Sequence, residues 1–391
     1  MISQQQLELN FQKQILTIMN RYKIFYLDDE KDDLIQPIKR RLEQNGLLEI
    51  VLEKPKNFET ELDRLSEILK GFDALILDLQ LDGPQEIKEG GGNDKFQVRY
   101  QAPPLAQTIR TLASEGYIND LPIILCSTER KIKDSFSKDF TSHNLFDWTF
   151  LKEDIDEMTI NKIVSLISGY QIISDNKSNF NEILKRNYSE VDERILSRFI
   201  NEENPPTHEI ARVIFKDIVQ CTGVLIDEAN LAARLGIDSV LSGDSWDSLL
   251  EKHFNSAKYT GVYHQSWSRW WNDIVIDIFE EITNENLASL NAETRVSLLI
   301  EHTEFKTLKP ATTIELCESN YFWSICEITQ KPIDPFEAFK INPKEEPKPW
   351  QDYSYVSLFG FLTKPDLVTK KGIKIHPSDT SRLLVERKKL D

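Results

Sequence analysis

The stretch KIFYLDDEKDD, Lys23–Asp33, places two adjacent carboxylates directly after a short apolar run. The run has the length and composition of a buried β-strand. Asp28 and Asp29 repel each other there, and burying a charged group is costly. One interpretation is the N-cap of a helix, a position that aspartate favours. The other is that a cation binds at the end of this strand.

Four further apolar runs follow, separated by helix-sized segments. The predicted strands are Lys23–Asp28, Leu47–Glu53, Asp73–Leu81, Leu121–Ser127 and Trp148–Lys152. Residues 33–46 and 58–72 show the spacing of amphipathic helices, with stop signals at Gly46 and Gly71. This alternation predicts an α/β doubly wound fold, a parallel five-stranded sheet with helices on both faces.

Polar residues lie where these strands end. Asp28 and Asp29 end the first strand, Asp78 lies near the end of the third, Ser127 ends the fourth and Lys152 ends the fifth. Parallel sheets gather their functional groups at the carboxyl ends of the strands, so we expect one site. The three carboxylates repel one another unless a divalent cation joins them, and oxygen ligands of this kind suit Mg²⁺.

In this order, the segments FYLDDE, LILDLQLDG, LPIILCSTE and FLKED resemble the receiver domains of bacterial two-component response regulators, over roughly residues 22–170. The resemblance implies that Asp78 accepts a phosphoryl group and that Asp28, Asp29 and Asp78 hold Mg²⁺. It implies that Ser127 and Lys152 contact the phosphoryl oxygens. A histidine kinase or phosphotransfer protein would be the partner that donates the group. Phosphoryl transfer depends on positioning and charge neutralisation, which metal and lysine supply.

The sequence departs from the family pattern around the fifth strand. Glu153 follows Lys152 where the family usually has proline, and Thr149 takes the place of the usual aromatic switch residue. We therefore expect the signal to leave through an insertion at residues 84–104 or through the loop that carries Trp148. Glycines 90–92 and two prolines predict that this insertion is flexible; it is a lid, a docking loop or a passive segment.

Two local interpretations concern residues close to the site. Glu30 and Asp32 are interpreted as a solvated helix start, and Cys126 as a small residue of the core. The spacing of Cys317 and Cys326 is unlike that of structural zinc sites, so buried free thiols are predicted there.

The chain is expected to contain a helical N-terminal extension (1–21), a receiver domain (22–173) and a mainly helical effector or interaction domain (174–391). The polar stretch SDNKSNFNEILKR, residues 174–186, marks the predicted boundary. We recognise no family in the C-terminal half.

Two features of that half carry alternatives. Asp227–Asp238 resembles the start of a helix-turn-helix, but Asp244 and Asp247 follow where a DNA-reading helix would carry basic or amide side chains. A packed helical turn is favoured. An aromatic cluster is interpreted as core or interface, or else as a ligand pocket in which arginine binds an anion. Its residues are Trp267, Arg269, Trp270 and Trp271.

The formal net charge of −17 argues against a nucleic-acid-coating surface, and no apolar run has the length of a bilayer span. We expect a cytoplasmic protein in which phosphorylation gates an output domain that binds an unknown protein or forms a homodimer. The alternatives are a receiver-regulated enzyme with an unrecognised catalytic site, a DNA-binding regulator and a pseudo-receiver scaffold.

Overall fold

The computed structural model describes residues 21–83, 85–87, 94–96, 98–134 and 142–390. The predicted N-terminal extension, apart from Arg21, lies outside these residues. The chain divides into two compact units. The first comprises the residues up to Phe215 together with Gly261–Ser266, and the second comprises Lys216–Thr260 and Trp267–Asp391.

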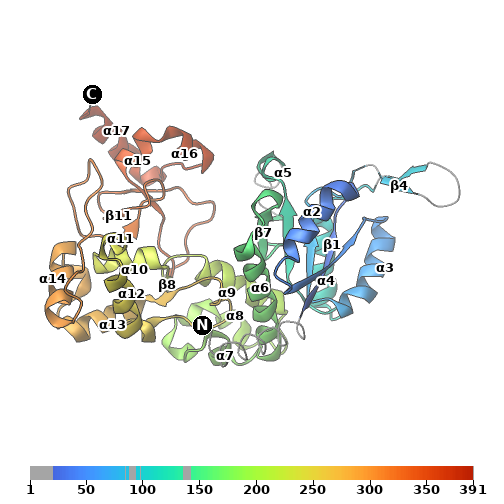
Figure 1. The fold of residues 1–391 in the computed structure, drawn as a ribbon, viewed down its shortest axis with the longest axis horizontal. Coiled ribbons are helices and arrows are strands. Elements are labelled where there is room, and N and C mark those ends of the chain that lie inside the picture. Colours follow the sequence, from blue (N-terminus) through green and yellow to red (C-terminus); the bar gives the residue numbers. More distant parts are fainter. Residues whose placement is uncertain (1–20, 84, 88–93, 97, 135–141, 391) are drawn as a thin grey trace, which may run out of the picture. The chain divides into compact units, whose positions relative to one another are not determined.

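A five-stranded sheet forms the centre of the first unit (Figure 1). Its strands lie in the order β2-β1-β3-β6-β7, and every neighbouring pair is parallel. The bounds are β1 (Tyr22–Leu27), β2 (Leu48–Glu53), β3 (Ala74–Leu77), β6 (Ile123–Ser127) and β7 (Trp148–Leu151). The chain begins at β1, adds β2 on one side, and then adds β3, β6 and β7 in turn on the other side, as in flavodoxin-like doubly wound folds. The predicted fold class is confirmed.

Helices flank both faces of this sheet, with α3 on one side and α6 on the other in Figure 1. The helices are α2 (Asp32–Leu42), α3 (Phe58–Ile68), α4 (Ala102–Ser114), α5 (Glu129–Asp134) and α6 (Glu157–Asp175). Phe25, Leu77 and Leu125 join the core that α3 and α4 cover. Successive strand residues alternate between faces, so a strand buried on both faces needs a nearly continuous apolar run.

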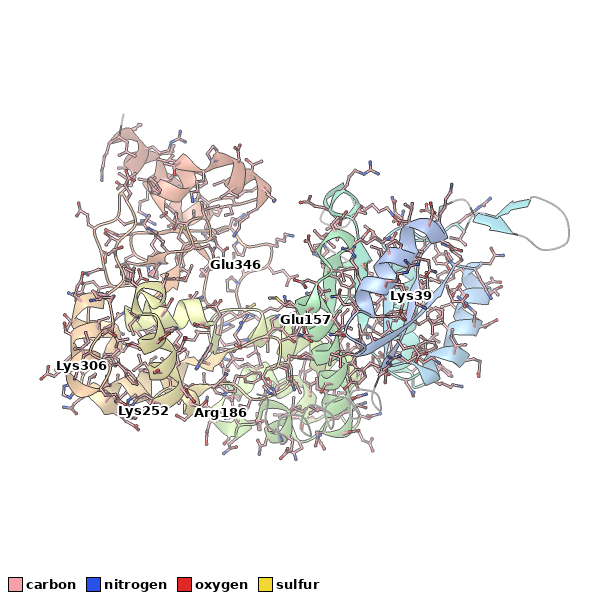
Figure 2. All side chains as sticks on the ribbon, in the orientation of Figure 1. Lys39, Glu157, Arg186, Lys252, Lys306 and Glu346 are labelled. Carbon is pink, nitrogen blue, oxygen red and sulfur yellow. The ribbon has the colours of Figure 1, made fainter. Side chains whose placement is uncertain are left out.

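An ion pair lies on the outer side of α2. Lys39, labelled on α2 in Figure 2, lies 3.8 Å from the carboxylate of Glu43 one turn later. The last of the helices that flank the sheet, α6, begins at Glu157. Its start is fixed by Asp156, whose side chain accepts a hydrogen bond from the Thr159 amide at 2.7 Å. In return, the Thr159 hydroxyl accepts a hydrogen bond from the Asp156 amide, which completes a capping box.

The segment predicted as a flexible insertion contains an antiparallel hairpin, β4 (Gln85–Ile87) and β5 (Asp94–Phe96). Its C-terminal end differs from the prediction, because Pro103 and Pro104 lie in the first turn of α4. Proline is tolerated there, since amides of the first turn have no partner within the helix. The three glycines lie outside the described residues.

The first unit continues past the boundary predicted near residue 174. It includes α7 (Phe180–Leu184), α8 (Ser197–Ile200) and α9 (Thr207–Ile214), and α9 packs on α6. The backbone amide of His208 donates to Asp120 at 2.8 Å, and its imidazole Nδ1 lies 2.7 Å from the same oxygen. These contacts fasten the start of α9 to the loop before β6.

The segment Gly261–Ser266 also belongs to the first unit. The Val262 amide donates to the Ile183 carbonyl at 3.0 Å. The buried ring of Tyr263 lies so close to Gly169 of α6 that a Cβ at this glycine would collide with it. A stretch distant in sequence thus completes the first unit, which a linear division of the sequence could not anticipate.

The second unit is helix-rich, as predicted. Its helices are α10 (Glu228–Leu235), α11 (Ser239–Ser242), α12 (Asp244–Lys252), α13 (Asn272–Thr283), α14 (Ala292–His302), α15 (Leu358–Thr363), α16 (Pro365–Lys370) and α17 (Thr380–Lys388). Its strands are β8 (Leu225–Ile226), β9 (Trp270–Trp271), β10 (Ser324–Ile325), β11 (Pro332–Ile333), β12 (Phe339–Lys340) and β13 (Tyr355–Val356). Residues 303–357, all of them described, form short strands and loops rather than helices.

Two apolar cores hold this unit together. One gathers residues of α10, α12, α13 and α14, including Trp246 and Phe279. The other gathers the C-terminal strands and helices around Cys326 and Phe339. The cysteines of the described chain are free thiols, and Cys126 and Cys326 are buried. In the part of the chain that is described, no helix combines the length and the apolar character that a membrane crossing needs.

Candidate functional site

Three carboxylates meet at the carboxyl end of the sheet, as predicted from the ends of the strands. Asp28 follows β1, Asp29 comes next, and Asp78 follows β3. Each offers one oxygen that lies within 4.8 Å of the others. Asp28 and Asp78 are fully buried. The parallel pairing of β1 with β3 produces this meeting, because Leu27 lies opposite Leu77 and both strands then end together.

Asp29 is held by the loop after β3. Its Oδ2 accepts a hydrogen bond from the Gly83 amide at 2.5 Å. A Cβ at Gly83 would collide with that carboxylate, so the Asp29 side chain would have to move to make room for it. Asp28 is held by a different amide, because its Oδ1 accepts a hydrogen bond from the Glu30 amide at 2.9 Å. Both carboxylates are therefore oriented by backbone amides.

Lys152 is the cation at the centre of the site. Its Nζ lies 2.7 Å from Asp28 Oδ2 and 3.1 Å from Asp78 Oδ1, and its side chain is 5% exposed. Burial alone would lower the pKa of Lys152, but Asp28 and Asp78 raise it above its usual range. The guanidinium of Arg41 on α2 donates to the backbone carbonyls of Lys152 and Glu153, which fixes the chain after β7.

Ser127 ends β6 and is fully buried. Its hydroxyl has no hydrogen-bond partner among the described residues. A buried hydroxyl without a partner is costly unless something supplies one. The predicted role of Ser127, a donor to phosphoryl oxygens, would satisfy it.

Two residues of the site were missed by sequence reasoning. Lys131, on α5, places its Nζ 2.9 Å from Asp78 Oδ2. Glu30, interpreted as part of a solvated helix start, instead lies 3.3 Å from the Lys152 ammonium and 3.7 Å from that of Lys131. The correction has a plain cause: both lysines are drawn to Asp78, and Glu30 is the next carboxylate within their reach. A lysine four residues after Ser127 was the only signal in the sequence.

The arrangement fits a magnesium ion. Mg²⁺ takes one or two carboxylates and keeps several waters, and three oxygens are gathered here. The pKa values of Asp28 and Asp29 are both raised, most of all by burial and further by Asp78. A divalent cation would relieve this cost, since it stabilises the ionised carboxylates. Asp28, Asp29 and Asp78 are thus the residues that would hold it.

These raised pKa values predict how stability depends on pH without Mg²⁺. In the unfolded chain, Asp29 loses its proton near the usual carboxyl pKa, about 4; in the folded chain it holds the proton to higher pH. Protonated Asp29 therefore contributes stability that is complete below the pKa of the unfolded chain. This contribution is lost as the pH rises through the raised pKa of Asp29 in the folded chain. We expect Asp29→Asn to gain stability over the wild type as pH rises, measured by urea unfolding from pH 4 to 7. Equal pH dependence in both proteins would contradict this.

A second prediction concerns the glycine that supports Asp29. Gly83→Ala should push the Asp29 carboxylate aside and weaken Mg²⁺ binding by about tenfold, the usual effect of losing a residue that orients a metal ligand. Isothermal titration calorimetry measures the affinity. Gly71→Ala is the matched control, because nothing lies within 4 Å of a Cβ added at Gly71. The same affinity in both variants would show that Gly83 does not set the position of Asp29.

The aromatic cluster of the second unit has the features of packing. Trp267, Trp270 and Trp271 are buried, and Trp270 belongs to an apolar core. Arg269 donates from Nε to the Val219 carbonyl at 2.7 Å and from Nη1 to the Ser268 carbonyl at 2.8 Å. These bonds occupy donors that an anion would need.

The segment that resembles a helix-turn-helix forms a packed turn. α10 is largely buried and ends at Gly236, whose φ of +74° suits glycine. The helix that follows, α11, spans four residues and presents Val240 and Leu241 to solvent. Such a short helix without basic or amide side chains does not provide a DNA-reading surface.

No family model matches the sequence, and no curated protein matches it. Among solved structures, the chain is similar to a response regulator receiver domain protein from Clostridium thermocellum, with 15% identity and a TM-score of 0.25, over 37% of this chain and 94% of that one. It is also similar to the response regulator RcsB of Salmonella typhimurium, with 15% identity and a TM-score of 0.24, over 47% of this chain and 71% of that one. At these values the comparisons carry no argument about function, and the fold is established by the strand order itself.

Proposed function

We propose that the first unit is a receiver domain that accepts a phosphoryl group at Asp78 in the presence of Mg²⁺, and that the second unit delivers the output. The observation that carries the proposal is the position of Asp78. This fully buried carboxylate faces a lysine ammonium on each oxygen, and two further carboxylates lie beside it. An aspartate with only a structural role would not need two lysines and two neighbouring carboxylates around it.

The chemistry follows from these groups. An oxygen of Asp78 attacks the phosphorus of a phosphodonor such as phosphohistidine on a kinase or phosphotransfer protein. The new O–P bond forms as the donor's P–N bond breaks, and the electron pair of that bond stays on the imidazole nitrogen. Lys152 pairs with the transferred oxygens and the Ser127 hydroxyl donates to them. Bound Mg²⁺ would supply further charge neutralisation.

We assign the output to the second unit, which would act by binding a protein partner or by forming a homodimer. The formal net charge of −17 and the short α11 both disfavour nucleic acid as the target. Sedimentation of the full chain with and without beryllofluoride tests the homodimer, because a mass increase on addition indicates dimerisation and an unchanged mass argues against it.

The central experiment is phosphoryl uptake. The full chain is incubated with acetyl phosphate, with and without Mg²⁺, and the modified peptide is identified by mass spectrometry. We expect a Mg²⁺-dependent adduct on Asp78. No adduct under conditions that label an ordinary receiver would refute the proposal and favour a pseudo-receiver scaffold.

A further inference from the structure

Lys131 is a cation that the receiver pattern did not lead us to expect. It lies on α5, four residues after Ser127, and its side chain is 14% exposed. Its Nζ contacts Asp78 Oδ2 at 2.9 Å, and the nearest oxygen of Glu30 is 3.7 Å away. It is thus bonded directly to one of the two oxygens that Asp78 could offer to a metal or a phosphoryl group.

The two oxygens of Asp78 differ in their contacts. Oδ2 accepts from the Gln80 amide at 3.2 Å as well as from Lys131, and a carboxylate oxygen has two lone pairs to offer. Oδ1 already faces Lys152 at 3.1 Å. Among the described residues Oδ1 makes no hydrogen bond, so the oxygen with filled hydrogen bonds is Oδ2, and a ligand that takes Oδ2 competes with Lys131.

The two lysines are held very differently. Lys152 contacts Asp28 at 2.7 Å and Glu30 at 3.3 Å in addition to Asp78, and its backbone is fixed by Arg41. Among the described residues, Lys131 pairs closely with Asp78 and more distantly with Glu30 at 3.7 Å, and it lies on a helix of six residues. Of the two, Lys131 is the one that can give way at smaller cost.

We propose that Lys131 is a displaceable internal counterion, which neutralises Asp78 in the resting protein and is released when Mg²⁺ binds. This inference rests on the proposed function of the site. Release of Lys131 would alter the restraint on α5. A change in the occupancy of the site would thereby be transmitted to a surface helix without an aromatic switch. That route suits a chain in which Thr149 occupies the switch position.

The decisive test measures the accessibility of the Lys131 amine. The full chain is treated with a limiting amount of an amine-acylating reagent, with and without saturating Mg²⁺, and the acylated lysines are quantified by peptide mass spectrometry. We expect acylation of Lys131 to rise several-fold on Mg²⁺ addition, while Lys152 stays protected. Unchanged or lower acylation of Lys131, or no Mg²⁺ binding at all, would overturn the inference.

A variant gives a second, independent measurement. Lys131→Met should bind Mg²⁺ about tenfold more tightly in calorimetry, because a competing positive charge a few ångströms away is gone. Lys70→Met is the matched control, since Lys70 is exposed and pairs with Glu67 at 3.2 Å; its affinity should equal that of the wild type. A Lys131→Met affinity no tighter than this control would also overturn the inference.

The outcomes separate this inference from the proposed function. If Mg²⁺ unmasks Lys131 but Asp78 accepts no phosphoryl group, the inference stands and the proposed function fails. If Asp78 is phosphorylated while Lys131 stays masked, the proposed function stands and Lys131 is a fixed part of the site.

Discussion

We expect Asp78→Asn to abolish phosphoryl uptake from acetyl phosphate, because an amide oxygen is a poor nucleophile and its amide nitrogen would face Lys152 or Lys131. The expected result is complete loss of the mass increase that we predict for the wild type with Mg²⁺. The variant should still fold, since asparagine has nearly the shape of aspartate and removes one of several crowded carboxylates.

The same strand offers a matched control. Asp73 precedes β3, at the opposite end from Asp78, and its carboxylate accepts from the Lys23 amide at 2.7 Å. Asp73→Asn keeps an oxygen for that bond and should leave uptake unchanged. An adduct that persists in Asp78→Asn would mean that another residue is the acceptor.

Lys152→Met should destabilise the sheet of the first unit by about 3 kcal/mol at neutral pH without Mg²⁺, since removing one partner of a buried ion pair leaves uncompensated charge. Asp28 and Asp78 would lose the ammonium that contacts both. The loss should shrink toward acidic pH, because protonated carboxyls need no counterion. Hydrogen exchange of the β1 and β3 amides measures the free energy of opening.

The loss of stability expected at neutral pH agrees with the direction in which the pKa of Lys152 is shifted, because its carboxylate partners raise this pKa. A lysine with a raised pKa contributes stability below its unfolded pKa and loses the contribution as pH rises through the folded one. Neutral pH lies within the range where the contribution is complete. Lys70→Met, an exposed pair with Glu67, should change the opening free energy by less than about 0.5 kcal/mol. A similar small change in Lys152→Met would mean that the carboxylates do not depend on it.

The strands and the central site residues followed from the sequence for a physical reason. A strand buried on both faces must be an apolar run, and Ile24, Leu75 and Ile124 are fully buried as such runs require. Parallel strands end at one edge, so Asp28 and Asp78 could be brought together without coordinates. Both facts can be read from the order of apolar and polar residues in the sequence.

Other parts of the site depend on contacts between segments that no local pattern encodes. The hairpin β4–β5 stands within a stretch whose glycines and prolines suggested only flexibility. Gly83 matters because its amide happens to meet Asp29, 54 positions earlier in the chain. Gly261–Ser266 joins the first unit although the residues on either side belong to the second.

The sequence by itself thus determined the doubly wound sheet, the meeting of Asp28, Asp29, Asp78 and Lys152 at its carboxyl edge, and the place of Ser127 at the end of β6. Only the tertiary structure decided that Lys131 and Glu30 join them. The reason lies in the positions of these residues in the chain. A residue at the end of a strand is placed at the sheet edge by the backbone, whereas Glu30 and Lys131 lie beyond the strand ends, and the direction of their side chains is set by the charges that surround them in the folded protein.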